Sequence, residues 1–301
     1  MFIRYGTAEN NIDVTHICFS KLLNKNNVIT IPFGDESRSN HFTDPAIGNL
    51  KSIYVILKNG NIYQYDSQYT IEIDLNKNAI SSISEDLIEK KIGIIHSKIN
   101  INYGSMDEEL PEQKMAFRNL KGNEKVLEIG GNIGRNSLLI ASILNNSKNL
   151  VTLESNKEIF KQLVQNRDLN DLDFNIENAA LSKRKLIQKG WDTMPSDILI
   201  EDYEWVNTIT IDELKQKYNI DFDTLILDCE GAFYFILMDM PEILDNINLI
   251  IMENDYDELH KKYYIDEILK RRGFYRDFVQ SGGYPDIHPC YENFFEVWKR
   301  Q

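Results

Sequence analysis

This sequence predicts an α/β fold with a mainly parallel sheet, preceded by a smaller β-rich domain. From residue 104 onwards, strand-like apolar runs alternate with segments of helical spacing. Residues 1–103 contain short β-rich runs without that alternation. Repeated β-then-α units are typical of a parallel sheet covered by helices on both faces. Because 301 residues are enough for two domains, we divide the chain into domains of residues 1–103 and 104–301.

The first domain reads as strands joined by turns. The runs "NVITIPF" and "YTIEIDL" predict strands, and "SIYVILKNGNIYQYD" predicts a hairpin around Asn59-Gly60. We also expect a strand in "KIGIIHSKINI". The polar stretch "FGDESRSNHFTDP" predicts an ordinary surface loop, with a binding loop as the alternative.

The second domain alternates strands with helices along its whole length. The predicted strands are "KVLEIG", "NLVTLES", "FNIENAAL", "DTLILDCEG", "INLIIMEND" and "NFFEVWKR", and the predicted helices are "DEELPEQKMAFRNL", "GRNSLLIASILNN", "KEIFKQLVQNRDLN", "AFYFILMDMPEIL" and "HKKYYIDEILKRRGF". "TITIDELKQKY" begins extended and then enters a helix. Ligands of parallel sheets bind at the carboxyl ends of the strands, so the functional residues are sought there.

Charge and composition exclude several classes of partner. The net charge of −14, from 33 basic and 47 acidic residues, repels phosphate backbones and predicts no nucleic-acid partner. The short basic run of residues 183–185 predicts a solvated turn. No apolar run has the length of a signal peptide core or a membrane span, which predicts no membrane association. Three cysteines without CxxC spacing predict a reducing compartment, the cytoplasm (of the host, if the chain is viral), and no structural zinc.

A glycine-rich turn follows the first strand of the second domain, in "VLEIGGNIGRNS". The dinucleotide fingerprint GxGxxG fails because Asn132 and Arg135 occupy two of its glycine positions, and no GK[ST] follows as a P-loop requires. The pattern that is present is an acid followed by two spaced glycines: Glu128, Gly130 and Gly134. A carboxylate beside such a turn repels a pyrophosphate and suits a cationic ligand, such as S-adenosylmethionine with its ammonium and sulfonium.

A second acidic residue supports a nucleoside ligand at the same edge of the sheet. Glu154 ends the next strand, 20 residues after Gly134. A carboxylate there can accept two hydrogen bonds from a ribose diol.

Residues 110–298 resemble the FkbM family of S-adenosylmethionine-dependent methyltransferases. The resemblance lies in "VLEIGGNIGRNS", "VTLESNKEIFKQLVQN", "ENAALS", "TITIDEL", "DTLILDCEGAFYFIL" and "LIIMEND", in that order and spacing. It does not extend to the first third of the chain. It implies a Rossmann-like class I methyltransferase fold with a seven-stranded sheet, and methyl transfer to a sugar hydroxyl of a glycan, nucleotide sugar or glycosylated metabolite.

The resemblance also implies roles for individual residues. Glu128, Gly130, Asn132 and Gly134 would hold the methionine part of the donor. Glu154 would hold the ribose, and Asn178 and Ala179 would lie beside the adenine. Asp228 and Glu230 would face the acceptor. This chain has Glu128, Gly131 and Asn254 where the family more often has Asp, Ala and His.

Two mechanisms of proton removal from the acceptor remain open. In the first, Asp228, Glu230 or His260 acts as a general base. In the second, Asp228, Glu253 and Asn254 bind a divalent cation such as Mg²⁺, which lowers the pKa of the acceptor hydroxyl. His288, in the loop "QSGGYPDIHPCYENFF", is a further candidate base.

The other side chains near these motifs are expected to pack. Cys229 is predicted to point away from its acidic neighbours, and the three tryptophans, Trp191, Trp205 and Trp298, are predicted to be core or surface residues.

Two other functions compete with O-methyl transfer. One is a non-catalytic or assembly module that keeps the fold, and the other is an N-methyltransferase acting on an amine or a protein. N-methyltransferases often carry NPPY or DPPY after the fourth strand, where this chain has "DCEG". The first domain is left with three roles: forming a homo-oligomer, narrowing the acceptor site or docking a glycan.

Overall fold

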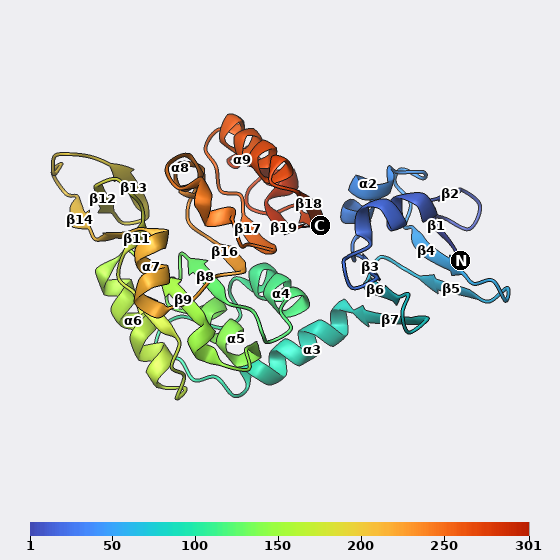
Figure 1. Ribbon diagram of the computed structural model, residues 1–301, viewed down its shortest axis with the longest axis horizontal. Coiled ribbons are helices and arrows are strands. Elements are labelled where there is room, and N and C mark those ends of the chain that lie inside the picture. The colour runs from blue at the N-terminus through green and yellow to red at the C-terminus, as the bar shows by residue number, and fades with distance from the viewer. Residues whose placement is uncertain (301) are drawn as a thin grey trace.

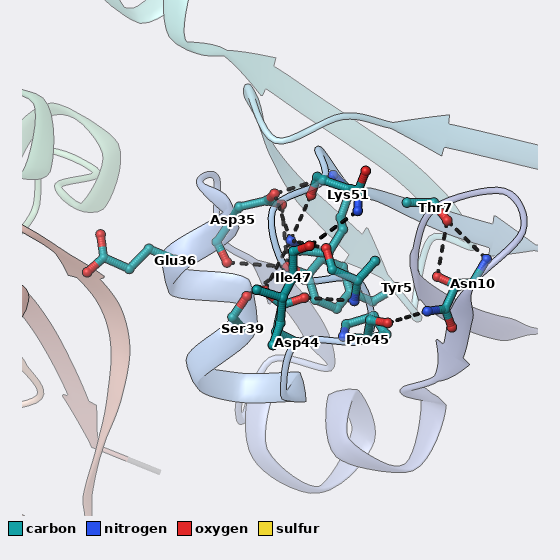
Figure 2. Close-up of polar contacts among 12 residues, drawn as sticks. Tyr5, Thr7, Asn10, Asp35, Glu36, Ser39, Asp44, Pro45, Ile47 and Lys51 are labelled. Atoms are coloured by element: carbon teal, nitrogen blue, oxygen red, sulfur yellow. Dashed lines mark hydrogen bonds and ion pairs between the residues drawn. The ribbon is translucent and has the colours of Figure 1, made fainter.

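The computed structural model describes residues 1–300 and shows two packed units (Figure 1). The N-terminal unit contains two antiparallel sheets, with strand orders β2-β1-β4-β5 and β3-β6-β7. Its elements are β1 (Phe2–Gly6), β2 (Asn11–Asp13), α1 (Thr15–Ile17), the π-helical turn η1 (Cys18–Leu22), β3 (Val28–Ile31), α2 (Asp35–Phe42), β4 (Ser52–Ile56), β5 (Ile62–Tyr65), β6 (Tyr69–Asp74) and β7 (Ala79–Ser84). The hairpin expected at Asn59-Gly60 is present, with Ile56 paired to Ile62.

The second unit is built on a seven-stranded sheet with the order β10-β9-β8-β16-β17-β19-β18. Every pair is parallel except β17–β19 and β18–β19. Its strands are β8 (Val126–Ile129), β9 (Leu150–Leu153), β10 (Asn175–Glu177), β16 (Thr224–Leu227), β17 (Leu249–Glu253), β18 (Phe274–Gln280) and β19 (Phe295–Arg300). The mainly parallel, Rossmann-like sheet is therefore confirmed.

Helices cover both faces of this sheet (Figure 1). They are α3 (Glu85–His96), α4 (Leu110–Asn119), α5 (Arg135–Ile143), α6 (Lys157–Asp168), α7 (Ile211–Tyr218), α8 (Phe233–Asp239) and α9 (Leu259–Arg271), with short 3₁₀ turns η2 (Ser147–Asn149), η3 (Pro241–Leu244) and η4 (Tyr291–Asn293). The central strands β8, β9 and β16 are buried along their whole length, which explains their unbroken apolar pattern. No helix within residues 1–300 is long and apolar enough to cross a membrane.

Two small sheets flank the carboxyl edge of the main sheet. The expected third strand "FNIENAAL" is split into β10 and β11 (Ala180–Leu181), which pairs with β15 (Thr208–Ile209). Between β11 and β15 the chain forms a three-stranded antiparallel sheet with the order β13-β12-β14. Its strands are β12 (Leu186–Lys189), β13 (Asp192–Pro195) and β14 (Glu204–Val206).

The strand predicted in "KIGIIHSKINI" is wrong, because residues 85–96 form helix α3. Ser84 caps this helix by accepting a hydrogen bond from the Leu87 N–H. Ile88 and Ile92, one turn apart, are buried in the core of the seven-stranded sheet. Helix α3, which precedes the boundary predicted at residue 103, therefore packs with the second unit.

The surface loop predicted in "FGDESRSNHFTDP" is also wrong, because its centre forms helix α2. Arg38 is fully buried and donates to the backbone carbonyls of Pro32 and Tyr69. Ser37 Oγ donates to the Val279 carbonyl on β18 and accepts from the Val279 N–H. The polar residues of this stretch therefore dock the N-terminal unit onto the edge strand β18.

We predict that Ile88→Ala lowers the free energy of unfolding by about 2–5 kcal/mol, because it leaves a cavity in the sheet core. Ile94→Ala is the matched control: it lies on the same helix, is 57% exposed and should change stability by less than about 0.5 kcal/mol. Urea unfolding followed by circular dichroism measures both. Equal effects would show that α3 does not belong to the core of the second unit.

Candidate functional site

The glycine turn after β8 lies directly against the end of β16. Gly130 has a φ of +91°, and a Cβ placed there would lie 1.5 Å from the Asp228 carbonyl oxygen. Gly134, with a φ of +99°, precedes α5, and a Cβ there would lie 2.5 Å from Leu163 Cδ1. Both positions require glycine because of their backbone conformation and their closeness to neighbouring atoms. The turn thus brings backbone atoms to the carboxyl edge of the sheet.

Glu128 lies beneath this turn rather than at the site. Its Oε2 accepts hydrogen bonds from Ser137 Oγ and from Thr152 Oγ1, the latter at 2.6 Å. Burial raises the pKa of Glu128 to about 7. The side chain therefore links β8 to β9 and α5, and it does not line the pocket described next.

A pocket of about 380 Å³ opens at the carboxyl ends of β8, β9, β16 and β17. Its size falls in the usual range for small-molecule sites. Seven of the sequence-predicted site residues line it: Gly130, Asn132, Glu154, Ala179, Asp228, Glu230 and Glu253. The structure brings together most of the predicted donor-binding and acceptor-side groups in one cavity.

Glu154 is held in the pocket by the backbone of two loops. Its Oε2 accepts from the Asn132 N–H at 2.9 Å, and its Oε1 accepts from the Asn156 N–H at 2.7 Å. Burial raises its pKa to about 7, although these hydrogen bonds oppose the rise. Each carboxylate oxygen has a second lone pair, so Glu154 can still accept from a ligand.

One end of the pocket is strongly acidic. Glu109 and Glu112, at the start of α4, join Asp228 and Glu253 there. Glu112 and Glu253 lie beside one another, and Glu112 Oε2 is buried without a donor. Burial first, and then Asp228 and Glu112, raise the pKa of Glu253 to about 11. Burial and the neighbouring carboxyls also raise the pKa of Asp228 far above its usual value.

Carboxyls this close cannot all ionise, so the cluster holds protons that a cation would displace. One basic side chain contacts the cluster: Arg135 Nη1 donates to Glu109 Oε1 at 2.6 Å, while another nitrogen of Arg135 pairs with Glu108. Asn132 Nδ2 also donates to Glu109, at 3.2 Å. Glu109 and Glu112 were missed by the sequence analysis, which placed them in the predicted helix "DEELPEQKMAFRNL" without a role in the site.

A second row of side chains runs from the pocket to the C-terminal loop. Glu230, with a φ of +50°, lies beside Asp255, and burial together with this neighbouring carboxyl raises the pKa of Glu230 to about 7. His288 Nε2 lies 3.6 Å from Asp255 Oδ1, and His288 Nδ1 accepts from the Tyr284 N–H at 2.7 Å. His288 therefore reaches the pocket edge only through Asp255.

His260 and Asn254 lie outside the pocket. His260 is on the surface of α9, where Nδ1 lies 3.2 Å from Glu258 Oε2 and the ring packs edge-on against Tyr234. The structure therefore does not support His260 as the base. Asn254 is fully buried, with its amide nitrogen donating to the Asn293 carbonyl. No group of three or more His, Cys, Asp or Glu arranged to hold a metal ion occurs within residues 1–300, so the predicted cation site is not supported.

Gly134 and Asn178 support the site from behind the pocket wall. Asn178 Nδ2 donates to the carbonyls of Glu154 and Ser155, which fixes the chain just after β9. Cys229 was predicted to pack and to point away from its acidic neighbours. It does pack against the core, but it also lines the pocket beside them.

The other end of the pocket is formed by residues that the sequence analysis took for surface. Arg184, expected in a solvated turn, makes two hydrogen bonds to Asp239 at 2.5 and 2.7 Å. Trp191, expected to pack, lies at the pocket rim and is 56% exposed. No local sequence pattern predicts that either residue lines a pocket. Their positions are set by the tertiary packing of the small sheet β13-β12-β14 and of the segment before it.

Comparisons with known proteins give matches among solved structures alone. No protein-family model and no curated protein matches the chain. Among solved structures, an O-methyltransferase from Bacillus cereus in complex with SAH shares 14% identity over 72% of this chain and 92% of its own, with a TM-score of 0.41. A putative O-methyltransferase from Klebsiella pneumoniae shares 11% over 73% and 91%, with a TM-score of 0.42. A ribosomal protein L11 methylase from Lactobacillus delbrueckii subsp. bulgaricus shares 11% over 67% and 82%, with a TM-score of 0.41.

We predict that the protein loses stability as the pH rises from 5 to 8. A carboxyl whose folded pKa is about 7 binds a proton that the unfolded chain, with a pKa near 4.5, has already released. The stabilisation from Glu128 is therefore complete below about pH 4.5 and is lost as the pH passes 7, by at most about 3 kcal/mol. Urea unfolding at several pH values should show a flatter profile for Glu128→Gln. Identical profiles would contradict a raised pKa at Glu128.

Proposed function

We propose that this chain is an S-adenosylmethionine-dependent O-methyltransferase of the FkbM type. Its acceptor is a sugar hydroxyl of a glycan, nucleotide sugar or glycosylated metabolite. The observation that carries the proposal is Glu154, a strand-end carboxylate held in the pocket by the backbone of the glycine turn. A carboxylate at this place is suited to a ribose diol.

The charges of the pocket fit the donor. S-adenosylmethionine carries two cationic groups and one carboxylate. The acidic end, formed by Glu109, Glu112, Asp228 and Glu253, can compensate the cations, while the peptide groups of the turn approach closely at Gly130. A dinucleotide, with a negatively charged pyrophosphate, would meet these same carboxyls and be repelled.

The chain's own residues would carry out two tasks. When bound, S-adenosylmethionine supplies a methyl carbon attached to a positively charged sulfur. Asp228 and Glu253 would orient the acceptor hydroxyl beside that carbon. A cation in the pocket lowers the pKa of nearby carboxyls, so Asp228 would lose its proton when the donor binds and could then accept the proton of the hydroxyl.

Glu230, Asp255 and His288 provide a route for that proton. Glu230 lines the pocket and contacts Asp255, which lies beside His288 at the C-terminal loop. In this arrangement His288 acts through Asp255 rather than on the acceptor itself.

We predict that S-adenosylhomocysteine binds the protein and that Glu154→Ala weakens binding about tenfold to a hundredfold. The loss corresponds to charge-assisted hydrogen bonds of about 1.5–3 kcal/mol. Isothermal titration calorimetry measures the dissociation constants. Glu158→Ala, on the exposed start of α6, is the control and should bind as the wild type does. No binding by the wild-type protein would reject the methyltransferase proposal and favour a non-catalytic module.

We also predict that Asp228→Asn lowers methyl transfer by at least about a hundredfold, the range of general-base catalysis. Calorimetry with S-adenosylhomocysteine measures in parallel how far the same substitution weakens donor binding, so that the catalytic loss is read from methyl transfer at saturating donor. The assay incubates the protein and S-adenosylmethionine with a panel of nucleotide sugars and oligosaccharides, and mass spectrometry detects a gain of about 14 Da, one methylene. Methylation of an amine in place of a hydroxyl would overturn the choice of oxygen acceptor.

A further inference from the structure

The apolar end of the pocket is a slot between two walls. One wall is α8 and its C-terminal end, through Phe235, Ile236 and Met240. The other wall is the small sheet β13-β12-β14, which is inserted between β11 and β15. Ala179 and Leu181 line the pocket between them. Figure 1 shows this small sheet at the upper left, with β8, β9 and β16 between it and α4.

Strand alternation decides which side chains of the small sheet face the slot. Leu186 pairs with Pro195 and Gln188 pairs with Thr193, so these four side chains share one face. All four line the pocket. Ile187, Met194 and Trp205 form the intervening row and share the opposite face. The face of the sheet that lines the pocket therefore combines the Gln188 amide and the Thr193 hydroxyl with the apolar side chains of Leu186 and Pro195.

A two-residue loop fixes Trp191 at the mouth of the slot. Lys189 and Asp192 are paired, so Gly190 and Trp191 alone connect β12 to β13. Gly190 has a φ of +60°, as tight hairpin loops require. Trp191 lines the pocket while more than half of its surface is exposed. An indole held in this way offers an uncovered aromatic face to a flat ligand.

The insertion is also anchored to the opposite wall. Just before β12, Arg184 makes its two hydrogen bonds to Asp239 at the end of α8. Lys183 Nζ donates to Glu242 Oε1 and to the Asp239 carbonyl, both at 2.8 Å. These contacts join the start of the insertion to the end of α8, so both walls of the apolar end are linked beside the pocket.

We propose that this insertion binds the purine base of the donor, with Trp191 stacking on the ring and Gln188 hydrogen bonding to its polar edge. The proposal rests on the proposed function, since it takes the donor to be an adenine nucleoside. The acidic end attracts the cationic part of such a ligand, and Glu154 binds its ribose. The purine base of the ligand would then lie in the apolar slot. The Gln188 amide has both a donor and an acceptor, which matches the amino group and ring nitrogens of adenine.

The first test compares two tryptophan variants by calorimetry with S-adenosylhomocysteine. Trp191→Ala should weaken binding at least about fivefold, as expected for loss of base stacking. Trp205→Ala is the matched control, because Trp205 is similarly exposed, at 49%, but belongs to the opposite face of the same sheet. It should bind within about twofold of the wild type. Equal dissociation constants for both variants would overturn the role of Trp191.

The second test reads out base recognition directly. The analogue of S-adenosylhomocysteine with an unsubstituted purine lacks the 6-amino group that would donate to Gln188 Oε1, so the wild-type protein should bind it less tightly than S-adenosylhomocysteine. Gln188→Leu should remove most of this preference, while Gln188→Glu should keep it, because the carboxylate can still accept a hydrogen bond from the amino group. An unaltered preference in Gln188→Leu would overturn the edge contact.

These outcomes separate the inference from the proposed function. If the wild-type protein binds neither ligand, the proposed function itself fails. If it binds S-adenosylhomocysteine but Trp191→Ala and Gln188→Leu both behave as the wild type does, only the assignment of the insertion fails. Circular dichroism of each variant excludes unfolding as the cause of lost binding.

Discussion

The site depends on the close approach of the glycine turn after β8 to the end of β16. A Cβ at Gly130 would overlap the Asp228 carbonyl oxygen, so only a residue without a side chain lets the two strand ends meet. The Asn132 N–H, two residues further on, then reaches Glu154 on β9. One steric constraint thus sets the relative positions of three strand ends, and with them the donor-binding carboxylate and the acceptor-side acids.

Charge is the second constraint on this pocket. Glu109, Glu112, Asp228 and Glu253 lie together with little compensation from basic side chains, and burial raises the pKa of each. Such a cluster disfavours anions and gains from a cation. The same groups would therefore help to select the donor. They would also lose protons when the donor binds, so donor binding would convert the base to its deprotonated, proton-accepting form.

The sequence was most informative where a residue's role is set by its immediate neighbours. The glycine turn, the strand-end position of Glu154 and the acids after β16 and β17 could be placed because parallel strands end at a common edge. The analysis went wrong where tertiary contacts decide. Residues 85–96 have apolar positions that fit either a strand or a helix, and burial of Ile88 and Ile92 against the sheet favours the helix. The polar stretch around Arg38 reads as a surface loop until its partners, the carbonyls of Pro32 and Tyr69, are known.

The sequence by itself determined the alternation of β8, β9, β16, β17 and β19 with their helices and the identity of the carboxylates at the strand ends, but it missed β18 and the β13-β12-β14 sheet. The alternation and the strand-end carboxylates follow from local periodicity and from the two-residue alternation of strands, which require no knowledge of distant contacts. Only the tertiary structure decided that Glu128 supports the turn from below, that Glu109 and Glu112 enter the pocket, and that Trp191 stands at its rim. These placements depend on packing between segments far apart in the chain, where the direction of a side chain is set by its neighbours in space.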